Sequence, residues 1–160
     1  MSAKFDATEL VRVAIIEERN GVSFYSTLAE KAADAGLRAS FAKMAEQEKV
    51  HEKRFQDMFD GLESTGQAGG YPDEYVSYLE TLVTTGASTG KSAGRKAQDF
   101  ADDMEAIDIA IGLERDQLIL MQDMADILGS AHRDVIDAII KEEQGHVVEL
   151  AAAKRRLQDG

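Results

Sequence analysis

Apolar side chains recur along most of the chain at alternating spacings of three and four residues. This is the period of a helix that buries one face, and the alternation is typical of helices packed into a bundle. Nothing alternates with the period of two that marks a half-buried strand. The sequence therefore predicts an all-α protein with four long helices, at about 7–36, 37–62, 97–128 and 130–157.

Glycines mark the expected ends of these helices. The first helix is expected to end near Gly36 and the third at Gly129, after which Ser130 is expected to cap the fourth. The connector between the second and third helices, about 63–94, is rich in small residues and contains two flexible breaks. A short extra helix is expected inside it, at about 73–84.

Composition narrows the class of protein. With 160 residues, 44% apolar and 30% charged, the chain is long enough for one domain with a core, which we expect to span residues 1–160. The absence of cysteine excludes disulfides and thiolate metal sites. The net charge of −12 argues against binding to nucleic acid or to an anionic membrane. The chain starts without a basic region followed by an apolar run, and no apolar run is long enough to span a membrane, so we expect a cytoplasmic location.

Six polar residues lie on the faces that the helices are predicted to bury. Each half of the chain has a lone glutamate, followed about thirty residues later by a Glu-x-x-His pair. The six residues are Glu18, Glu48 and His51 in the first half, and Glu114, Glu143 and His146 in the second. Four carboxylates and two imidazoles, contributed by four helices, are the ligand set of a dinuclear metal site in a helical bundle.

Burial of these carboxylates favours a metal site. One ionised carboxylate inside a protein costs several kcal/mol, and four would offset a typical domain stability of about 5–15 kcal/mol. Two divalent cations would neutralise them. The alternative is a set of solvated ion pairs on helix surfaces. It requires two of the three histidines to fall by accident in the same motif, at matching places in two halves.

Several neighbouring polar residues need separate assignment. Glu17 adjoins Glu18, and we assign Glu18 as the ligand because its face continues to Tyr25 and because it matches Glu114 in the repeat. Tyr25 could hydrogen-bond a ligand carboxylate or simply fill the core. His132 is expected at the surface or at a helix cap. Four further glutamates lie off the buried faces and are expected to be solvated: Glu46, Glu52, Glu142 and Glu149.

Through residues 14–25 and the two Glu-x-x-His pairs, the sequence resembles the rubrerythrin-like branch of the ferritin-like superfamily. The resemblance extends over nearly the whole chain. It implies a left-handed four-helix bundle with a di-iron site bridged by glutamates, and it carries over the same six residues as ligands. In that family the centre oxidises Fe(II) with oxygen or hydrogen peroxide, or reduces hydrogen peroxide.

The chain departs from that family in two ways. Full-length rubrerythrins add a cysteine-rich rubredoxin module as electron donor, whereas this chain has no cysteine, so a peroxidase would need a separate donor. They also carry a further glutamate one turn after the third-helix ligand, where this chain has Gln117. Both departures bear on peroxidase turnover.

Two classes of function remain open. The first is an oxidoreductase that couples Fe(II) oxidation to the reduction of oxygen or hydrogen peroxide. The second is a non-enzymatic iron-binding or storage-linked protein, or a bundle with a structural metal. Carboxylate and imidazole ligands suit two iron ions, with Mn(II) or Zn(II) as alternatives.

The long connector also suggests an assembly. Ordinary helix–helix connections have about 2–8 residues, so the stretch 63–94 is long enough to cross the bundle or to reach a neighbouring chain. We therefore expect a homodimer, in which the second helix pair is either kept within its own chain or exchanged with the partner.

Overall fold

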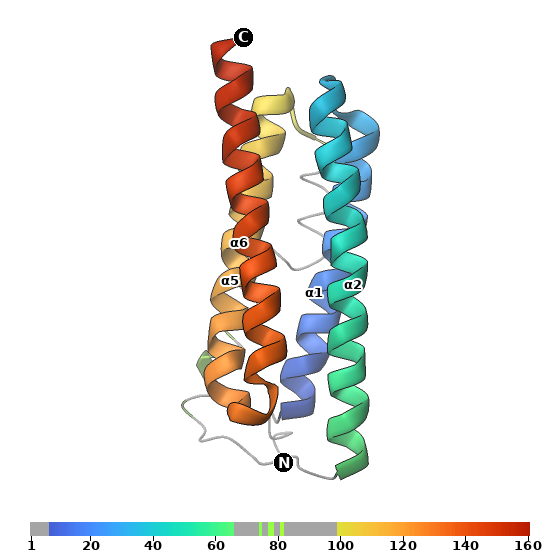
Figure 1. Ribbon diagram of the computed structural model, residues 1–160, viewed down its shortest axis with the longest axis vertical. Coiled ribbons are helices and arrows are strands. Elements are labelled where there is room, and N and C mark those ends of the chain that lie inside the picture. Colours follow the sequence, from blue (N-terminus) through green and yellow to red (C-terminus); the bar gives the residue numbers. More distant parts are fainter. Residues whose placement is uncertain (1–6, 66–73, 75–76, 79–80, 82–98) are drawn as a thin grey trace.

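The computed structural model describes residues 7–65, 74, 77–78, 81 and 99–160, and it confirms the all-α class. Within these residues there is no strand, and four long helices form a bundle (Figure 1). The helices are α1 (Ala7–Lys31), α2 (Ala35–Thr65), α5 (Asp103–Leu128) and α6 (Ser130–Asp159). Of the short helix expected at 73–84, only residues 74, 77–78 and 81 are described, so this helix stays a prediction.

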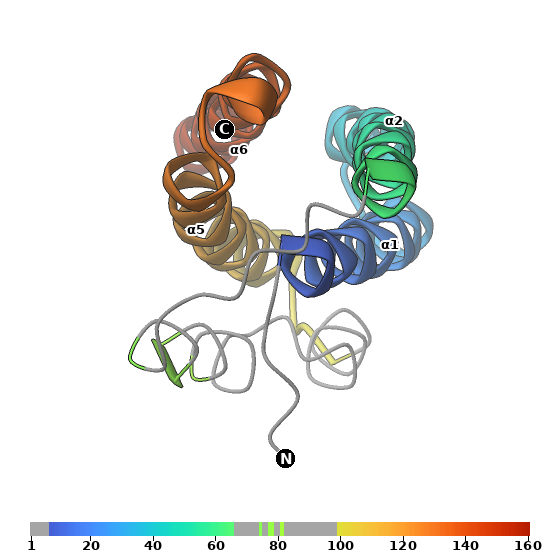
Figure 2. The same ribbon diagram turned by 90° about the horizontal axis from the view of Figure 1, so that it is seen from below.

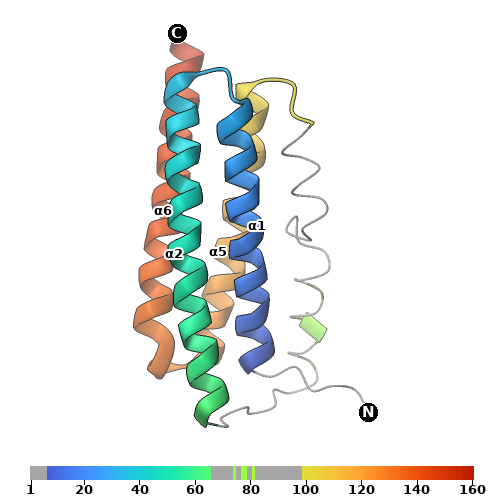
Figure 3. The ribbon, with the colours of Figure 1, turned by 90° about the vertical axis from the view of Figure 1, so that its right-hand side faces the viewer.

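The bundle is built from two helical hairpins. α1 packs antiparallel to α2 and α5 packs antiparallel to α6, while α1 also contacts α5 and α2 contacts α6 (Figure 2). The end of α2 and the start of α5 lie at opposite ends of the bundle (Figure 3). None of the described helices is long and apolar enough to cross a membrane.

The turn between α1 and α2 comes earlier than the sequence predicted. α1 ends at Lys31, and Gly36 already belongs to α2. The reason is a cap that was not predicted. The carboxylate of Asp34 accepts a hydrogen bond from the backbone N–H of Leu37 at 2.8 Å, which satisfies a free donor at the start of α2. The arginine Arg156, on α6, pairs with the same carboxylate at 2.6 Å.

A second carboxylate ties this turn to the other hairpin. Asp103, the first residue of α5, accepts hydrogen bonds from the backbone N–H groups of Ala33 at 2.9 Å and Asp34 at 2.8 Å. α5 begins here rather than near residue 97, because Asp102 caps it by accepting from the N–H of Glu105 at 2.9 Å. The two hairpins are thereby joined at one end.

The turn between α5 and α6 uses glycine alone. Gly129 has a φ of +73°, a left-handed conformation that glycine adopts without steric cost. The chain therefore reverses within one residue, and Ser130 already lies in the first turn of α6. The prediction that Ser130 caps α6 is wrong, since Gly129 occupies the cap position and no side chain caps the helix.

Two hydrophobic clusters fill the bundle, one towards each end. The Asp34-end cluster, near the α1–α2 turn, includes Phe24, Tyr25, Leu28, Leu37, Phe41, Met44, Ile107 and Leu150. The Gly129-end cluster, near the α5–α6 turn, includes Leu10, Val11, Phe55, Met58, Met121, Met124, Ile136 and Ile139. On every helix, the predicted ligand positions fall between the residues that join one cluster and those that join the other.

The buried face of α5 is rotated from the predicted one. The sequence placed Ile111 and Leu118 on that face, but both are partly exposed. Ala110 and Gln117 are buried in their place. α5 carries apolar side chains around much of its circumference, so periodicity alone did not fix which stripe packs inward. The predicted faces of α1 and α2 are buried.

The tie at Asp103 is expected to stabilise the bundle. Replacing Asp103 with Ala should leave two backbone donors without their acceptor and lower the free energy of unfolding by about 1–3 kcal/mol, measured by urea denaturation. Asp108→Ala is the matched control, because Asp108 is exposed on the same helix and pairs with Lys154. The control should change stability by less than about 0.5 kcal/mol. Equal effects of the two changes would contradict this role.

Candidate metal centre

The six residues predicted as ligands meet in one layer between the two hydrophobic clusters. We call them the Glu/His cluster: Glu18, Glu48, His51, Glu114, Glu143 and His146. Their side chains are between 0% and 2% exposed. The two hydrophobic clusters cover the layer on both sides along the bundle axis.

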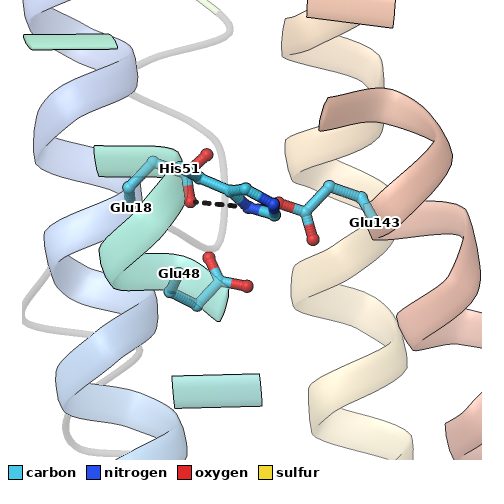
Figure 4. A group of neighbouring side chains, drawn as sticks. All are labelled: Glu18, Glu48, His51 and Glu143. Carbon is cyan, nitrogen blue, oxygen red and sulfur yellow. Dashed lines mark ion pairs between the residues drawn. The ribbon is translucent and has the colours of Figure 1, made fainter. Parts of the chain in front are cut away.

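Each helix contributes to the layer in the way that its sequence spacing predicts. α1 and α5 each supply one glutamate, while α2 and α6 each supply a Glu-x-x-His pair. Residues three apart lie on one face of a helix, so both members of a pair point inward. Figure 4 shows Glu18, Glu48 and Glu143 around the ring of His51.

The cluster divides into two overlapping groups of ligand atoms. One group comprises Glu18, Glu48, His51 and Glu143, and the other comprises Glu48, Glu114, Glu143 and His146. Within each group, one ligand atom from every residue lies within 4.8 Å of the others. Glu48 and Glu143 belong to both groups. The residues would therefore suit two cations: Glu48 and Glu143 are available to both, and each cation would have one further glutamate and one histidine.

Glu143 lies between the two imidazoles. Its Oε1 is 2.8 Å from Nδ1 of His51, and its Oε2 is 2.8 Å from Nδ1 of His146. The Nδ1 atom of His146 is also 3.2 Å from Glu114 and 3.4 Å from Glu48, while that of His51 is 3.6 Å from Glu18. Both histidines thus direct the same ring nitrogen into the cluster.

A glycine makes room for one of the shared carboxylates. Gly21 lies on α1 one turn after Glu18, and a Cβ atom at this position would be 2.7 Å from Oε2 of Glu48. A glycine inside a helix costs about 0.5–1 kcal/mol relative to alanine. Its presence here is explained by the close approach of the Glu48 carboxylate to the backbone of α1.

The carboxylates of the cluster fit a cation because protein groups leave them unsatisfied. No hydroxyl, amide or backbone N–H among the described residues donates to either oxygen of Glu18 or Glu48 or to the second oxygen of Glu114, and the oxygens of Glu143 contact only the two imidazoles. Buried polar atoms in proteins are normally paired. The donor set of carboxylate oxygens and imidazole nitrogens is one that binds Fe(II), Mn(II) and Zn(II). The residues present therefore fit a pair of such ions.

Burial disfavours the charged form of three of these glutamates. It raises the pKa of Glu18 and Glu48 well above the usual value, and neighbouring carboxylates add to the effect. For Glu114, burial likewise dominates and the pKa is about 7. In the absence of a cation, the ionisation of any one of these three carboxyl groups therefore makes the ionisation of the other two less favourable.

The other three members of the cluster are held in their charged forms. Burial opposes the ionisation of Glu143, but the imidazoles of His146 and His51 outweigh it and its pKa is about 2. Burial also opposes the charge on each histidine, and the carboxylates outweigh it: the pKa of His51 is about 9 beside Glu143, and that of His146 is about 10 beside Glu114. Protons thus partly balance the carboxylates.

Tyr25 has both of the roles between which the sequence left the choice open: it hydrogen-bonds a carboxylate of the cluster and it fills part of the core. Its hydroxyl donates a hydrogen bond to Oε1 of Glu114, and its ring packs in the Asp34-end cluster, stacked on Phe41 with ring centroids 6.0 Å apart. Burial raises its pKa, so the hydroxyl keeps its proton at neutral pH. The assignment of Glu18 rather than Glu17 also agrees with the structure, since Glu17 is buried but belongs to neither group of ligand atoms.

The outer nitrogens of the histidines have partners that the sequence analysis missed. Nε2 of His51 lies 2.6 Å from Oε2 of Glu142, and Nε2 of His146 lies 3.0 Å from Oε1 of Gln47. Glu142 had been expected to be solvated, and its side chain is indeed 37% exposed, but its contact with His51 had not been predicted. It is one residue off the buried face of α6, and it is half-buried because α2 packs alongside and presents His51 and Arg54 to it.

Other polar residues near the layer behave in different ways. Gln117 is buried one turn after Glu114, and neither atom of its amide has a hydrogen-bond partner among the described residues. Sequence periodicity missed its burial because it placed the inward face of α5 one residue away. His132 is partly exposed. The remaining off-face glutamates form ion pairs with lysines or arginines on the bundle surface: Glu46, Glu52 and Glu149.

The metal-free protein is expected to be more stable at pH 5 than at pH 8. A carboxyl whose pKa is raised by folding loses stability as the pH rises from its unfolded pKa to its folded pKa, here from 4.5 to about 7 for Glu114. The raised pKa values of His51 and His146 act in the same direction, because their contribution is lost above 6.5 as the pH approaches about 9 and about 10. Urea denaturation of chelator-treated protein measures the decline.

A substitution separates the contribution of Glu114 to this decline. Glu114→Gln keeps the acceptor for Tyr25 but removes the buried charge, and it should remove up to about 3 kcal/mol of the loss between the two pH values. Glu46→Gln, at an exposed position, should leave the decline unchanged. A stability that is flat or rises over this range would contradict the burial of ionisable carboxylates.

Comparisons with known proteins agree with this geometry. The family model described as rubrerythrin matches residues 9–154. The crystal structure of a Thermotoga maritima protein, described as ferritin-like and diiron-carboxylate, is similar over 97% of this chain and 98% of that chain, with a TM-score of 0.69 and 25% sequence identity. No curated protein matches the chain. Since the family model covers nearly its whole length, the chain belongs to the rubrerythrin family and has the ferritin-like fold.

Proposed function

We propose that the protein binds two iron ions in the Glu/His cluster and couples the oxidation of Fe(II) to the reduction of oxygen or hydrogen peroxide. The observation that carries the proposal is the pair of overlapping ligand groups that share Glu48 and Glu143. The description of the Thermotoga maritima protein as diiron-carboxylate supports the choice of iron. The carboxylate and imidazole donors alone would also accept Mn(II) or Zn(II).

The charge of the cluster's carboxylates supports a stoichiometry of two iron ions per chain. The four glutamates of the cluster carry four negative charges when ionised, which two divalent cations would neutralise. A single cation would leave two buried carboxylates to be balanced by protons, at the cost that burial imposes on them. Two ions would also supply positive charge close to the carboxylate oxygens that lack a protein donor.

The protein's own residues prepare the site for redox chemistry. When bound, the iron ions supply the electrons that pass to oxygen or peroxide. Glu142 and Gln47 accept from the outer nitrogens of the histidines and thereby orient both rings. Tyr25 holds a proton against Glu114, within the layer. The hydrophobic clusters above and below exclude bulk water, which restrains side reactions.

The proposed partners follow from the same chemistry. Oxygen or hydrogen peroxide and Fe(II) are the substrates, and a peroxidase cycle needs a separate electron donor because the chain has no cysteine for a rubredoxin-type centre. The homodimer, with its helix pairs kept or exchanged, stays a prediction, since most of the connector lies outside the described residues.

The stoichiometry gives the first test. Chelator-treated protein reconstituted with Fe(II) under anaerobic conditions should bind two iron ions per chain, measured by elemental analysis after desalting. Glu48→Ala or Glu143→Ala should lower this to less than one, because each change removes a ligand from both groups. Glu46→Ala, which alters an exposed pair with Lys49, is the control and should still bind two. One ion or none in the folded parent protein would defeat the proposal.

Turnover gives the second test. With excess Fe(II) and either oxygen or hydrogen peroxide, the parent protein should oxidise many equivalents of Fe(II) per site, followed by absorbance and by oxidant consumption. Glu48→Ala should reduce the rate to that of free Fe(II). If oxidation instead stops after the bound ions have reacted once, the proposed enzyme is ruled out. That outcome would favour the alternative, an iron-binding or storage-linked protein without turnover.

A further inference from the structure

The two halves of the Glu/His cluster repeat in sequence, but their surroundings differ. The outer nitrogen of His51 faces a carboxylate, at 2.6 Å from Glu142. The outer nitrogen of His146 faces an amide oxygen, at 3.0 Å from Gln47. Both partners can accept, so each Nε2 donates its proton to them, and a cation would displace the proton of Nδ1 and take the lone pair that this atom directs into the cluster. The two imidazoles thus direct the same atom, Nδ1, into the cluster, but the group that contacts Nε2 differs: a carboxylate for His51 and an amide for His146.

A carboxylate partner makes an imidazole the stronger ligand. A negatively charged acceptor draws on the Nε2 proton more strongly than a neutral amide does, and this raises the basicity of Nδ1. Arg54 also contacts Glu142, but at 3.2 and 3.3 Å, and it is about one third exposed. The shorter contact to His51 therefore dominates. In the metal-free protein the pKa of His146 is the higher of the two because Glu114 and Glu143 contact its ring, but both of these carboxylates would themselves be ligands to a cation. The partner of Nε2, considered by itself, makes His51 the better donor to a cation than His146.

Glu18 and Glu114, the glutamates outside the Glu-x-x-His pairs, also differ in their hydrogen bonds, and this difference too favours the half that contains His51. Glu114 accepts a hydrogen bond from the hydroxyl of Tyr25, which occupies a lone pair of Oε1 and withdraws charge from the carboxylate. Among the described residues no hydroxyl, amide or imidazole donates a hydrogen bond to Glu18, and Nδ1 of His51 is 3.6 Å from its Oε2. The position on α5 that corresponds to Tyr25 in the repeat is Met121, seven residues after Glu114, and its thioether has no proton to donate. No hydroxyl therefore shares the carboxylate of Glu18 with a cation, whereas Tyr25 shares that of Glu114.

We propose that the two metal positions are unequal, and that the one held by Glu18 and His51 fills first and binds a divalent cation more tightly. Glu48 and Glu143 serve both positions and therefore do not discriminate between them. This inference rests on the proposed function, since it requires two cation positions. It goes further by giving the order of loading and by assigning Glu142, Gln47 and Tyr25 as positioning residues that set it.

The order of loading is tested by removing one position at a time. Zn(II), which is redox-inert and accepts the same ligands, is titrated into chelator-treated protein against a chromophoric competitor. The parent protein should show two phases that differ by about tenfold or more in affinity. Glu114→Ala should keep the tighter phase and Glu18→Ala the weaker one. Circular dichroism confirms that each variant is folded.

Exchanging the residues that contact the two Nε2 atoms, Glu142 and Gln47, tests whether they cause the difference in affinity. Glu142→Gln, made in the Glu114→Ala background, should weaken the remaining position by about tenfold, because the change replaces a carboxylate with an amide of the same shape. Gln47→Glu, made in the Glu18→Ala background, should strengthen the remaining position by a similar factor. A merely structural role would not give effects of opposite sign from these two isosteric changes.

A matched control separates the hydrogen bond from the general field of the charge. Glu149 lies on α6 one turn after His146, is partly exposed and pairs with Lys43 at 3.1 Å. Glu149→Gln removes one negative charge, as Glu142→Gln does, without touching an imidazole, so it should leave both affinities within about twofold. An equal effect of the two changes would overturn the role of Glu142.

The outcomes also distinguish this inference from the proposed function. Two Zn(II) ions that bind with equal affinity, or a tighter phase that survives in Glu18→Ala instead of Glu114→Ala, would overturn the unequal positions and leave a two-ion site standing. A parent protein that binds fewer than two ions would overturn the proposed function, and this inference with it.

Discussion

The structure depends on the burial of four carboxylates in one layer of a helical bundle. Isolated carboxylates at such a depth would cost several kcal/mol each, and two of these, Glu18 and Glu48, have no hydroxyl, amide or backbone donor among the described residues to offset that cost. Two histidines balance part of the charge, and Glu143 lies between them. The remainder calls for cations, which explains why a chain of ordinary length keeps so much charge in its interior.

The rest of the bundle serves this layer. Hydrophobic clusters lie on both sides of it, and each helix passes from one cluster through the layer into the other. Gly21 gives up helix stability so that Glu48 can approach α1 closely. At one end Asp34 and Asp103 tie the two hairpins together, and at the other Gly129 lets the chain reverse within one residue. The helices are thus held at a common level, which the convergence of six side chains requires.

The chemical character of each half-site comes from residues outside the ligand set. Glu142 contacts the outer nitrogen of His51, Gln47 contacts that of His146, and Tyr25 donates a hydrogen bond to Glu114. These three differ in charge and in hydrogen-bonding role, although the ligands themselves are repeated. A duplicated motif can therefore give two chemically distinct positions, since affinity depends on the basicity that the outer groups impose on the ligands.

The sequence by itself determined the helical class, the two hairpins and the six members of the cluster. It could do so because helical periodicity assigns a face to each residue, and glutamates on apolar faces stand out. Only the tertiary structure decided which stripe of α5 turns inward, and hence that Gln117 is buried. The α1–α2 turn depended on it in part, because Asp34 caps α2 locally through Leu37 but is also held by Arg156 and Asp103, which are distant in sequence. The contact between Glu142 and His51 could not be predicted for the same reason. The two residues lie on different helices, 91 positions apart, and no pattern within either helix indicates that they meet.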